Sequence, residues 1–124
     1  MEYMLVYLQS TEDFAVRQDP TAYAPVMAAW GAYMGAMGAA GVMRSGHALQ
    51  GPRTMTTVRQ RDGKRQVQDG PFADTREHLG GYVIIDVPSL DDALVWASRA
   101  PCVATGGTQV IPVADMSAHM PKAA

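Results

Sequence analysis

The sequence predicts an α+β domain of the split βαβ, ferredoxin-like type, with a β-hairpin inserted between its two halves. Three observations lead to this prediction. Apolar, β-branched runs alternate with two segments of helical periodicity, in the order β-α-β, hairpin, β-α-β. An Asp-Gly pair separates two runs in the middle of the chain. The 124 residues suit one domain, which we place at residues 1–115, followed by a disordered tail at 116–124.

The first part of the chain predicts a strand, a loop and a long helix. Residues 3–8 form an apolar run typical of a strand covered on both faces, and the polar residues 9–20 that follow predict a loop. From about 21 to 40, apolar residues recur every three or four positions and therefore share one helical face. Pro25 is expected in the first turn, where its missing N–H costs little. Gly41 is expected to cap the C-terminus.

The middle of the chain predicts the hairpin. Two strand-like runs, 53–60 and 64–69, flank the Asp-Gly pair at 62–63, which is the sequence signal of a type I′ turn. That turn places Val58 opposite Val67. Both faces of the hairpin are largely polar, so we expect it to project from the core or to lie at an edge.

The remaining strands and the second helix follow from local signals. A weak strand is expected at 42–49, the clearest central strand at 79–87, and a last strand at 108–113. Ser89 is expected to cap the second helix, with Asp92 as its capping-box partner. Four residues are expected to form the apolar stripe of that helix: Leu90, Ala93, Leu94 and Ala97.

The pattern of the central strand predicts a dimer. Two helices on one face of an antiparallel sheet leave the other face bare. Val83 and Ile85 point to one side of the strand, and Tyr82 and Ile84 to the other, so neither face is fully polar. A second copy that packs sheet to sheet would cover the bare face. We therefore expect a homodimer of the dimeric α/β-barrel type.

Composition excludes several classes of protein. Hydrophobic residues make up 48% of the chain and charged ones 18%, which is typical of a globular domain. The net charge of −2 argues against nucleic-acid binding and gives no attraction to an anionic membrane surface. No apolar run approaches the roughly 18 residues that span a bilayer. The single cysteine, Cys102, favours a cytoplasmic location, and we expect it to be a buried, inert thiol.

One segment carries a family resemblance. Residues 69–82 have the sequence Asp-Gly-Pro-Phe-Ala-Asp-Thr-Arg-Glu-His-Leu-Gly-Gly-Tyr. This resembles the motif D-G-P-F-A-E-T-K-E-x-L-G-G of the DGPF branch of the YCII-related proteins, and the similarity extends to about residue 115. The resemblance implies a dimeric ferredoxin-like fold. It implies little about chemistry, because most members are uncharacterised.

The resemblance also carries two functional associations. YCII relatives are suspected of enzyme activity through a His–Asp pair whose histidine lies on the first helix, but residues 21–40 contain no histidine, so that pair cannot be carried over. Some DGPF proteins are encoded beside, or fused to, extracytoplasmic-function sigma factors, which implies a regulatory partner. Within the motif Asp74, Arg76 and His78 depart from the pattern, and the first two keep the charge but not the reach or geometry.

Asp69 and His78 are the candidate catalytic residues. Asp69 could act as a general base or ligand anchor if it is partly desolvated, or it could close an Asx turn. His78 could transfer protons near neutral pH if it met His47 and Asp69 in space, or it could be an ordinary hydrogen-bonded histidine.

The candidate binding residues are Phe72, Arg76, Glu77 and His47. Arg76 could bind a carboxylate or phosphate through two parallel hydrogen bonds, or it could pair with Asp74, with Glu77 or with the partner subunit. Phe72 could line a pocket or plug the edge of the core. No cofactor or metal is expected, since two separated histidines without matched spacing form no recognised metal site.

Three functions stay open from the sequence. The first is a small-molecule-binding or proton-transfer dimer built on these residues, and whether it would be an enzyme is undecided. The second is a regulatory module that binds a sigma factor through the hairpin region. Residues 53–65 there hold five of the ten basic residues, which also suits a solvated edge that discourages strand pairing. The third is an accessory structural dimer.

Overall fold

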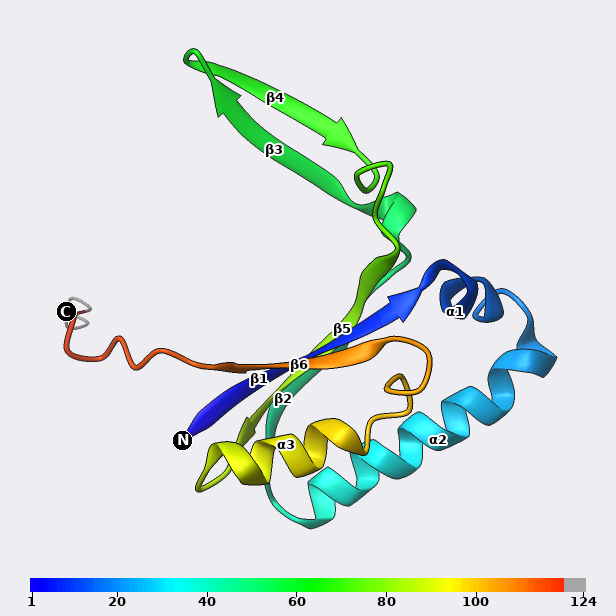
Figure 1. The fold of residues 1–124 in the computed structure, drawn as a ribbon, viewed down its shortest axis with the longest axis vertical. Coiled ribbons are helices and arrows are strands. Elements are labelled where there is room, and N and C mark those ends of the chain that lie inside the picture. The colour runs from blue at the N-terminus through cyan, green and yellow to red at the C-terminus, as the bar shows by residue number, and fades with distance from the viewer. Residues whose placement is uncertain (120–124) are drawn as a thin grey trace.

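Four strands form the central sheet of the computed structural model, which describes residues 1–119 (Figure 1). They are β1 (Glu2–Ser10), β2 (Met43–Ala48), β5 (Glu77–Asp86) and β6 (Gly107–Pro112), in the spatial order β2-β5-β1-β6. All neighbouring strands are antiparallel. A helix of 20 residues lies between β1 and β2, and one of nine residues lies between β5 and β6, which is the split βαβ order that the sequence predicts.

Capping residues hold both ends of helix α2 (Pro20–Ala39). The side chain of Asp19 accepts hydrogen bonds from two backbone N–H groups of the first turn. At the other end Gly41 has a φ of 70°, and the backbone N–H of Val42 donates to Met37 O at 3.2 Å. This is a Schellman arrangement, so Gly41 is the C-terminal cap that the sequence predicts.

Two predictions for this region are wrong. The expected loop over 9–20 contains a short helix, α1 (Thr11–Val16). Ser10 and Asp13 begin it with a reciprocal capping box, a signal hidden in a polar stretch. Pro25 lies in the interior of α2, because the helix has already completed its first turn before it.

The core lies between one face of the sheet and the helices α2 and α3 (Leu90–Ser98) (Figure 1). Ser89 caps α3 as predicted. Alternate residues of β1 and β5 meet the helices, and the buried set includes Tyr3, Leu5, Tyr7, Val83, Ile85, Tyr33, Met37, Ala93 and Ala97. Leu90 and Leu94, expected in the apolar stripe of α3, are instead about half exposed, and Trp96 packs against the core in their place.

No described helix covers the opposite face of the sheet. Val83 and Ile85 are fully buried under the helices, whereas Tyr82 and Ile84 point to the other side and are half-buried. The sequence therefore assigned the two sides of β5 correctly. The apolar residues that β1, β5 and β6 place on the uncovered face are Met4, Val6, Leu8, Leu79, Tyr82, Ile84 and Ile111.

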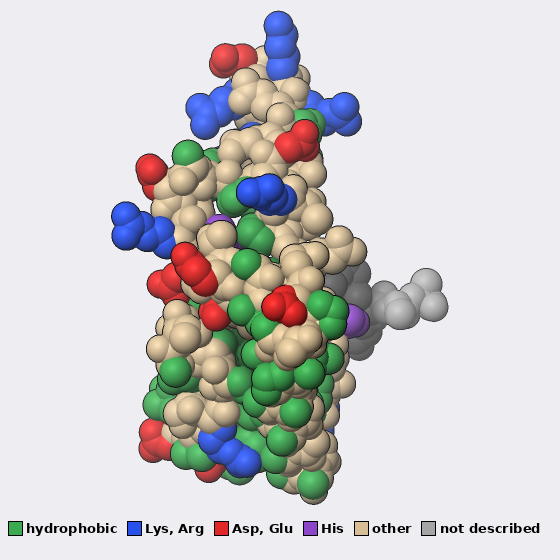
Figure 2. Space-filling view, turned by 90° about the vertical axis from the view of Figure 1, so that its right-hand side faces the viewer, with side chains coloured by type: hydrophobic (Ala, Val, Ile, Leu, Met, Phe, Trp, Pro, Cys, Tyr) green, Lys and Arg blue, Asp and Glu red, His purple; other side chains and the backbone are tan. Residues whose placement is uncertain are grey.

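Strands β3 (Thr56–Arg61) and β4 (Lys64–Asp69) form a separate two-stranded sheet that projects from the body (Figure 1). Residues 62–63 have φ values of 53° and 74°, as a type I′ turn requires, and Val58 pairs with Val67. The turn and the register are those the sequence predicts. Both valines are exposed, and Lys and Arg side chains surround the tip of the hairpin (Figure 2).

The C-terminal segment expected to be a tail, 116–124, falls only partly within the described structure. The backbone N–H of His119 donates to Met116 O at 2.9 Å and closes a turn. Residues 120–124 lie outside the described residues.

Candidate ligand-binding cavity

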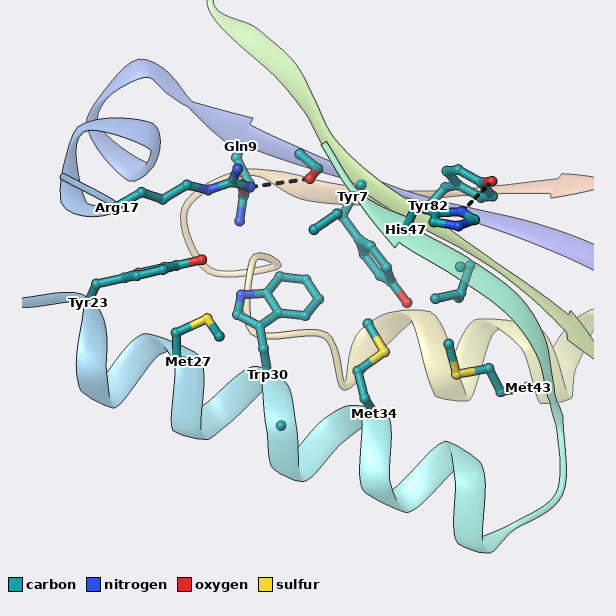
Figure 3. A pocket seen from close by; sticks show the side chains of 16 residues that line it. Tyr7, Gln9, Arg17, Tyr23, Met27, Trp30, Met34, Met43, His47 and Tyr82 are labelled. Atoms are coloured by element: carbon teal, nitrogen blue, oxygen red, sulfur yellow. Dashed lines mark hydrogen bonds between the residues drawn. The ribbon is translucent and has the colours of Figure 1, made fainter. Parts of the chain in front are cut away.

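A cavity of about 390 Å³ opens between α2 and the sheet (Figure 3). This volume lies within the range of small-molecule sites. The side chains of the helix wall are Tyr23, Met27, Trp30 and Met34. Because α2 contains no charged residue, this wall is almost entirely apolar. None of the described helices, α2 included, is long and apolar enough to cross a membrane.

Glycines form part of the sheet wall. Gly46 of β2 and Gly80 and Gly81 of β5 line the cavity. A Cβ atom on Gly80 would collide with the side chain of Gln9, and one on Gly81 would lie 2.8 Å from the backbone oxygen of His47. Close packing of the strands therefore requires glycine at these positions, and the missing side chains leave room above the sheet.

Arg17, the residue that follows α1, places a positive charge at one end of the cavity (Figure 3). Its guanidinium donates to Gln9 Oε1 at 2.9 Å, to Gly80 O at 3.2 Å and to Leu49 O. All three acceptors are neutral, and within residues 1–119 Arg17 belongs to neither ion pair. A guanidinium carries five N–H donors, so these three bonds leave two of them unused.

Two buried tyrosines lie beside the cavity, and Tyr7 lines it. Tyr7 Oη is 2.9 Å from Tyr33 Oη, and Tyr33 donates to the backbone oxygen of Trp96 at 3.0 Å. Burial raises the pKa of both phenols, and the bond to Tyr33 raises the pKa of Tyr7 further. The ring of Trp30 packs edge-on against Tyr7, with centroids 4.9 Å apart. Both phenols therefore stay neutral across the ordinary pH range.

A second cavity of about 350 Å³ adjoins the first. The two share Gln9, Arg17, Tyr23 and Trp30, and the second also reaches Cys102. The Cys102 thiol is buried as predicted, and burial raises its pKa, which keeps it protonated.

Five of the six predicted site residues line neither cavity: Asp69, Phe72, Arg76, Glu77 and His78. The first four are exposed, and within the described chain their side chains join no hydrogen bond or ion pair. Arg76 therefore pairs with neither Asp74 nor Glu77 in the described chain. Phe72 packs under the guanidinium of Arg59, 5.2 Å from the ring centroid.

The two histidines are separated by the sheet. His78 is buried beside the ring of Phe14, its Nε2 is 3.2 Å from Thr11 Oγ1, and its Nδ1 has no partner among residues 1–119. His47 lines the cavity, but its ring lies on the far side of the sheet, where Nδ1 is 2.9 Å from Tyr82 Oη (Figure 3). The structure does not join either histidine to Asp69 by a hydrogen bond. The catalytic roles of Asp69 and His78 stay predictions.

Sequence reasoning missed Tyr7, Gln9, Arg17 and Tyr23 as site residues. Arg17 lies in the segment expected to be a loop, where nothing local marks it. A usable signal existed in β1, whose inward positions end in Tyr7 and Gln9 after two apolar residues. Polar groups at buried strand positions need partners, and they often point to a site.

The sheet, its helix-covered face and the projecting hairpin define a small α+β domain. The family model of the YCII-related domain matches residues 1–117, and the chain belongs to this family, which confirms the resemblance.

An uncharacterised protein of Rhizobium meliloti (strain 1021) is 43% identical over 60 residues, or 47% of this chain and 48% of the relative. The chain thus spans about half the length of the curated relative it matches. A solved structure, 5-chloro-2-hydroxyhydroquinone dehydrochlorinase from Burkholderia phenoliruptrix AC1100 in complex with 2,5-dihydroxybenzoquinone, has a TM-score of 0.54. That likeness covers 92% of this chain and 94% of the other at 18% identity, and it shows the fold alone.

Proposed function

We propose that the protein binds a small, largely apolar organic anion in the cavity between α2 and the sheet. The observation that carries this proposal is Arg17, a cation held by neutral acceptors at the end of an apolar cavity. A partly buried charge without a counter-charge is unfavourable. An anionic ligand would supply the missing partner through charge-assisted hydrogen bonds.

The walls of the cavity favour a flat ligand. Trp30, Met34 and Met43 contribute an aromatic ring and two flexible thioethers, which adapt to a planar ring. The dehydrochlorinase of similar fold is described in complex with 2,5-dihydroxybenzoquinone, a flat ring with acidic hydroxyl groups. That likeness makes the same class of molecule a good first probe.

Calorimetric titration with 2-naphthoate and with 2,5-dihydroxybenzoquinone tests this proposal. Removing one charge-assisted contact by Arg17→Gln should weaken binding by about tenfold or more. Arg65→Gln, on the exposed hairpin, is the matched control and should leave the affinity unchanged. Wild-type protein that gives no saturable heat with either probe would rule the proposal out, provided that its thermal unfolding is normal.

The uncovered sheet face supports a second part of the proposal, a homodimer that packs sheet to sheet. Ile84 lies near the centre of that face, between β1 and β2. Ile84→Asp would place a charge in the interface and should convert a dimer to a monomer in sedimentation experiments. Leu94→Asp, on the exposed side of α3, should not. A wild-type monomer at micromolar concentration would contradict this part.

The hairpin supports an alternative function as a regulatory interaction module. An isolated two-stranded hairpin is marginally stable in water, and this one carries exposed basic residues that form no ion pair within the described chain. An acidic surface on an extracytoplasmic-function sigma factor would complement that charge. Capture of such a factor should be lost when Arg59, Arg61 and Arg65 are changed to Gln. Capture that survives the triple change would remove the alternative.

A further inference from the structure

The hydrogen bonds of the core fix the direction in which Tyr7 donates its proton. Tyr33 Oη lies 3.0 Å from Trp96 O, a backbone carbonyl that can only accept. A phenol carries one proton, so the proton of Tyr33 is committed to Trp96. The 2.9 Å contact between the two hydroxyls must then be donated by Tyr7. Tyr7 has no proton left for a ligand, and its oxygen can only accept.

Burial keeps this arrangement in place. Tyr7 and Tyr33 are 3% and 5% exposed, so bulk water cannot readily replace either hydrogen bond. The raised pKa of Tyr7 keeps the phenol neutral, so it serves neither as a base nor as an anion. In Figure 3 the hydroxyl end of Tyr7 points toward Met34, inside the cavity.

The other end of the cavity has the opposite polarity. Arg17 offers two N–H donors there, and the side chain of Tyr23 extends toward the same end (Figure 3). Gln9, which holds Arg17, and Tyr7 are two residues apart on one face of β1, which corresponds to about 7 Å along the strand. The cavity of about 390 Å³ has room for a flat system of one or two rings between these ends.

We infer that the ligand is an aromatic hydroxy acid, with an anionic oxygen at Arg17 and a hydroxyl group that donates to Tyr7 Oη. This inference rests on the proposed function and deepens it, since it names the chemical class that the cavity selects. An analogue with a methyl ether in place of the hydroxyl has no proton to donate. Its ether oxygen and Tyr7 Oη would then both be hydrogen-bond acceptors, with no proton between them. An unpaired acceptor in a buried site loses affinity.

The test compares three rigid probes by calorimetry: 6-hydroxy-2-naphthoate, 6-methoxy-2-naphthoate and 2-naphthoate. We expect the hydroxy acid to bind about threefold to tenfold more tightly than the methoxy acid, the range that one neutral hydrogen bond provides. Equal binding of all three, or tighter binding of the methoxy acid, overturns the inference and leaves the proposed function standing. Failure of all three to bind overturns the inference, and if 2,5-dihydroxybenzoquinone also fails to bind, the proposed function falls with it.

Three matched tyrosine variants locate the effect. Tyr7→Phe should abolish the preference for the hydroxy acid. Tyr33→Phe removes the acceptor of the Tyr7 proton, so Tyr7 can donate into the cavity and the preference should shrink or reverse. Tyr3→Phe removes a buried hydroxyl that bonds Met1 Sδ outside both cavities, and it should leave the preference unchanged.

The ratio of the two affinities is the readout, because a general loss of packing would weaken both probes alike. If Tyr33→Phe folds poorly, Tyr7→Phe decides the question alone, since Tyr33 keeps its bond to Trp96 there. A preference that survives Tyr7→Phe overturns the inference.

Discussion

The cavity under α2 and the exposed segment at 69–77 are built in opposite ways. Residues of the cavity come from β1, α2, β2 and β5, with Arg17 added from the end of α1, and hydrogen bonds through Arg17 and the buried tyrosines tie them together. The side chains predicted as a site within 69–77 are exposed and reach neither cavity. The recognisable motif thus identifies the family, whereas residues outside its first half shape the cavity. Only its last part, Gly80 and Gly81, reaches the cavity wall.

Filling the cavity should produce the largest difference between the two regions. Gly31 lines the cavity, and a Cβ there would meet nothing within 4 Å. Gly31→Leu should abolish binding of 2-naphthoate while stabilising α2 by about 0.8 kcal/mol. Calorimetry and thermal unfolding measure both effects.

Gly38→Leu is the control for that change, since Gly38 also has open space but lies outside the cavity. It should stabilise α2 similarly and preserve binding. Undiminished affinity in Gly31→Leu would place the ligand elsewhere.

The glycines at the end of the motif should matter through packing. Gly81→Ala would place a methyl group 2.8 Å from the backbone oxygen of His47. We expect the free energy of unfolding to fall by about 1–3 kcal/mol, as in other overpacked cores. Denaturant unfolding measures this change. Gly70, which has open space but a φ of 79°, offers a contrast in which Gly70→Ala acts through backbone strain alone.

Alkaline pH should loosen the cavity before it affects the exposed segment. The pKa values of Tyr7 and Tyr33 are raised in the folded state, so the unfolded state ionises first as the pH rises. Their contribution to stability is complete below about pH 10, the pKa of an unfolded tyrosine, and declines above it. Chemical unfolding measured between pH 8 and 11, at intervals of about one pH unit, should show this decline in the free energy of unfolding. A Tyr7→Phe variant should show a shallower one.

The smallest effect is expected in the exposed first half of the motif. Asp69→Asn should change the affinity for 2-naphthoate by less than about twofold, because isosteric surface changes have small effects. A tenfold loss of affinity would show that Asp69 belongs to the binding site, as the sequence-based hypothesis states. Because Asp69 lines neither cavity here, a second subunit or a different conformation would then have to bring it to the ligand.

The sequence predicted those parts of the fold that local chemistry determines. The turn at 62–63, the cap at Ser89 and the alternation of Tyr82 and Val83 all follow from signals within a few residues. Helix α1 was missed because its capping box lies in a polar stretch with little periodicity. The cavity depends on the separation between α2 and glycine-lined strands, which no single segment specifies.

The most direct measurement is a crystal structure of the protein grown with 6-hydroxy-2-naphthoate. We expect the carboxylate at Arg17, the rings against Trp30 and the hydroxyl within hydrogen-bond distance of Tyr7 Oη. Density for the ligand beside Asp69 and Phe72, with the cavity under α2 empty, would contradict the proposed site.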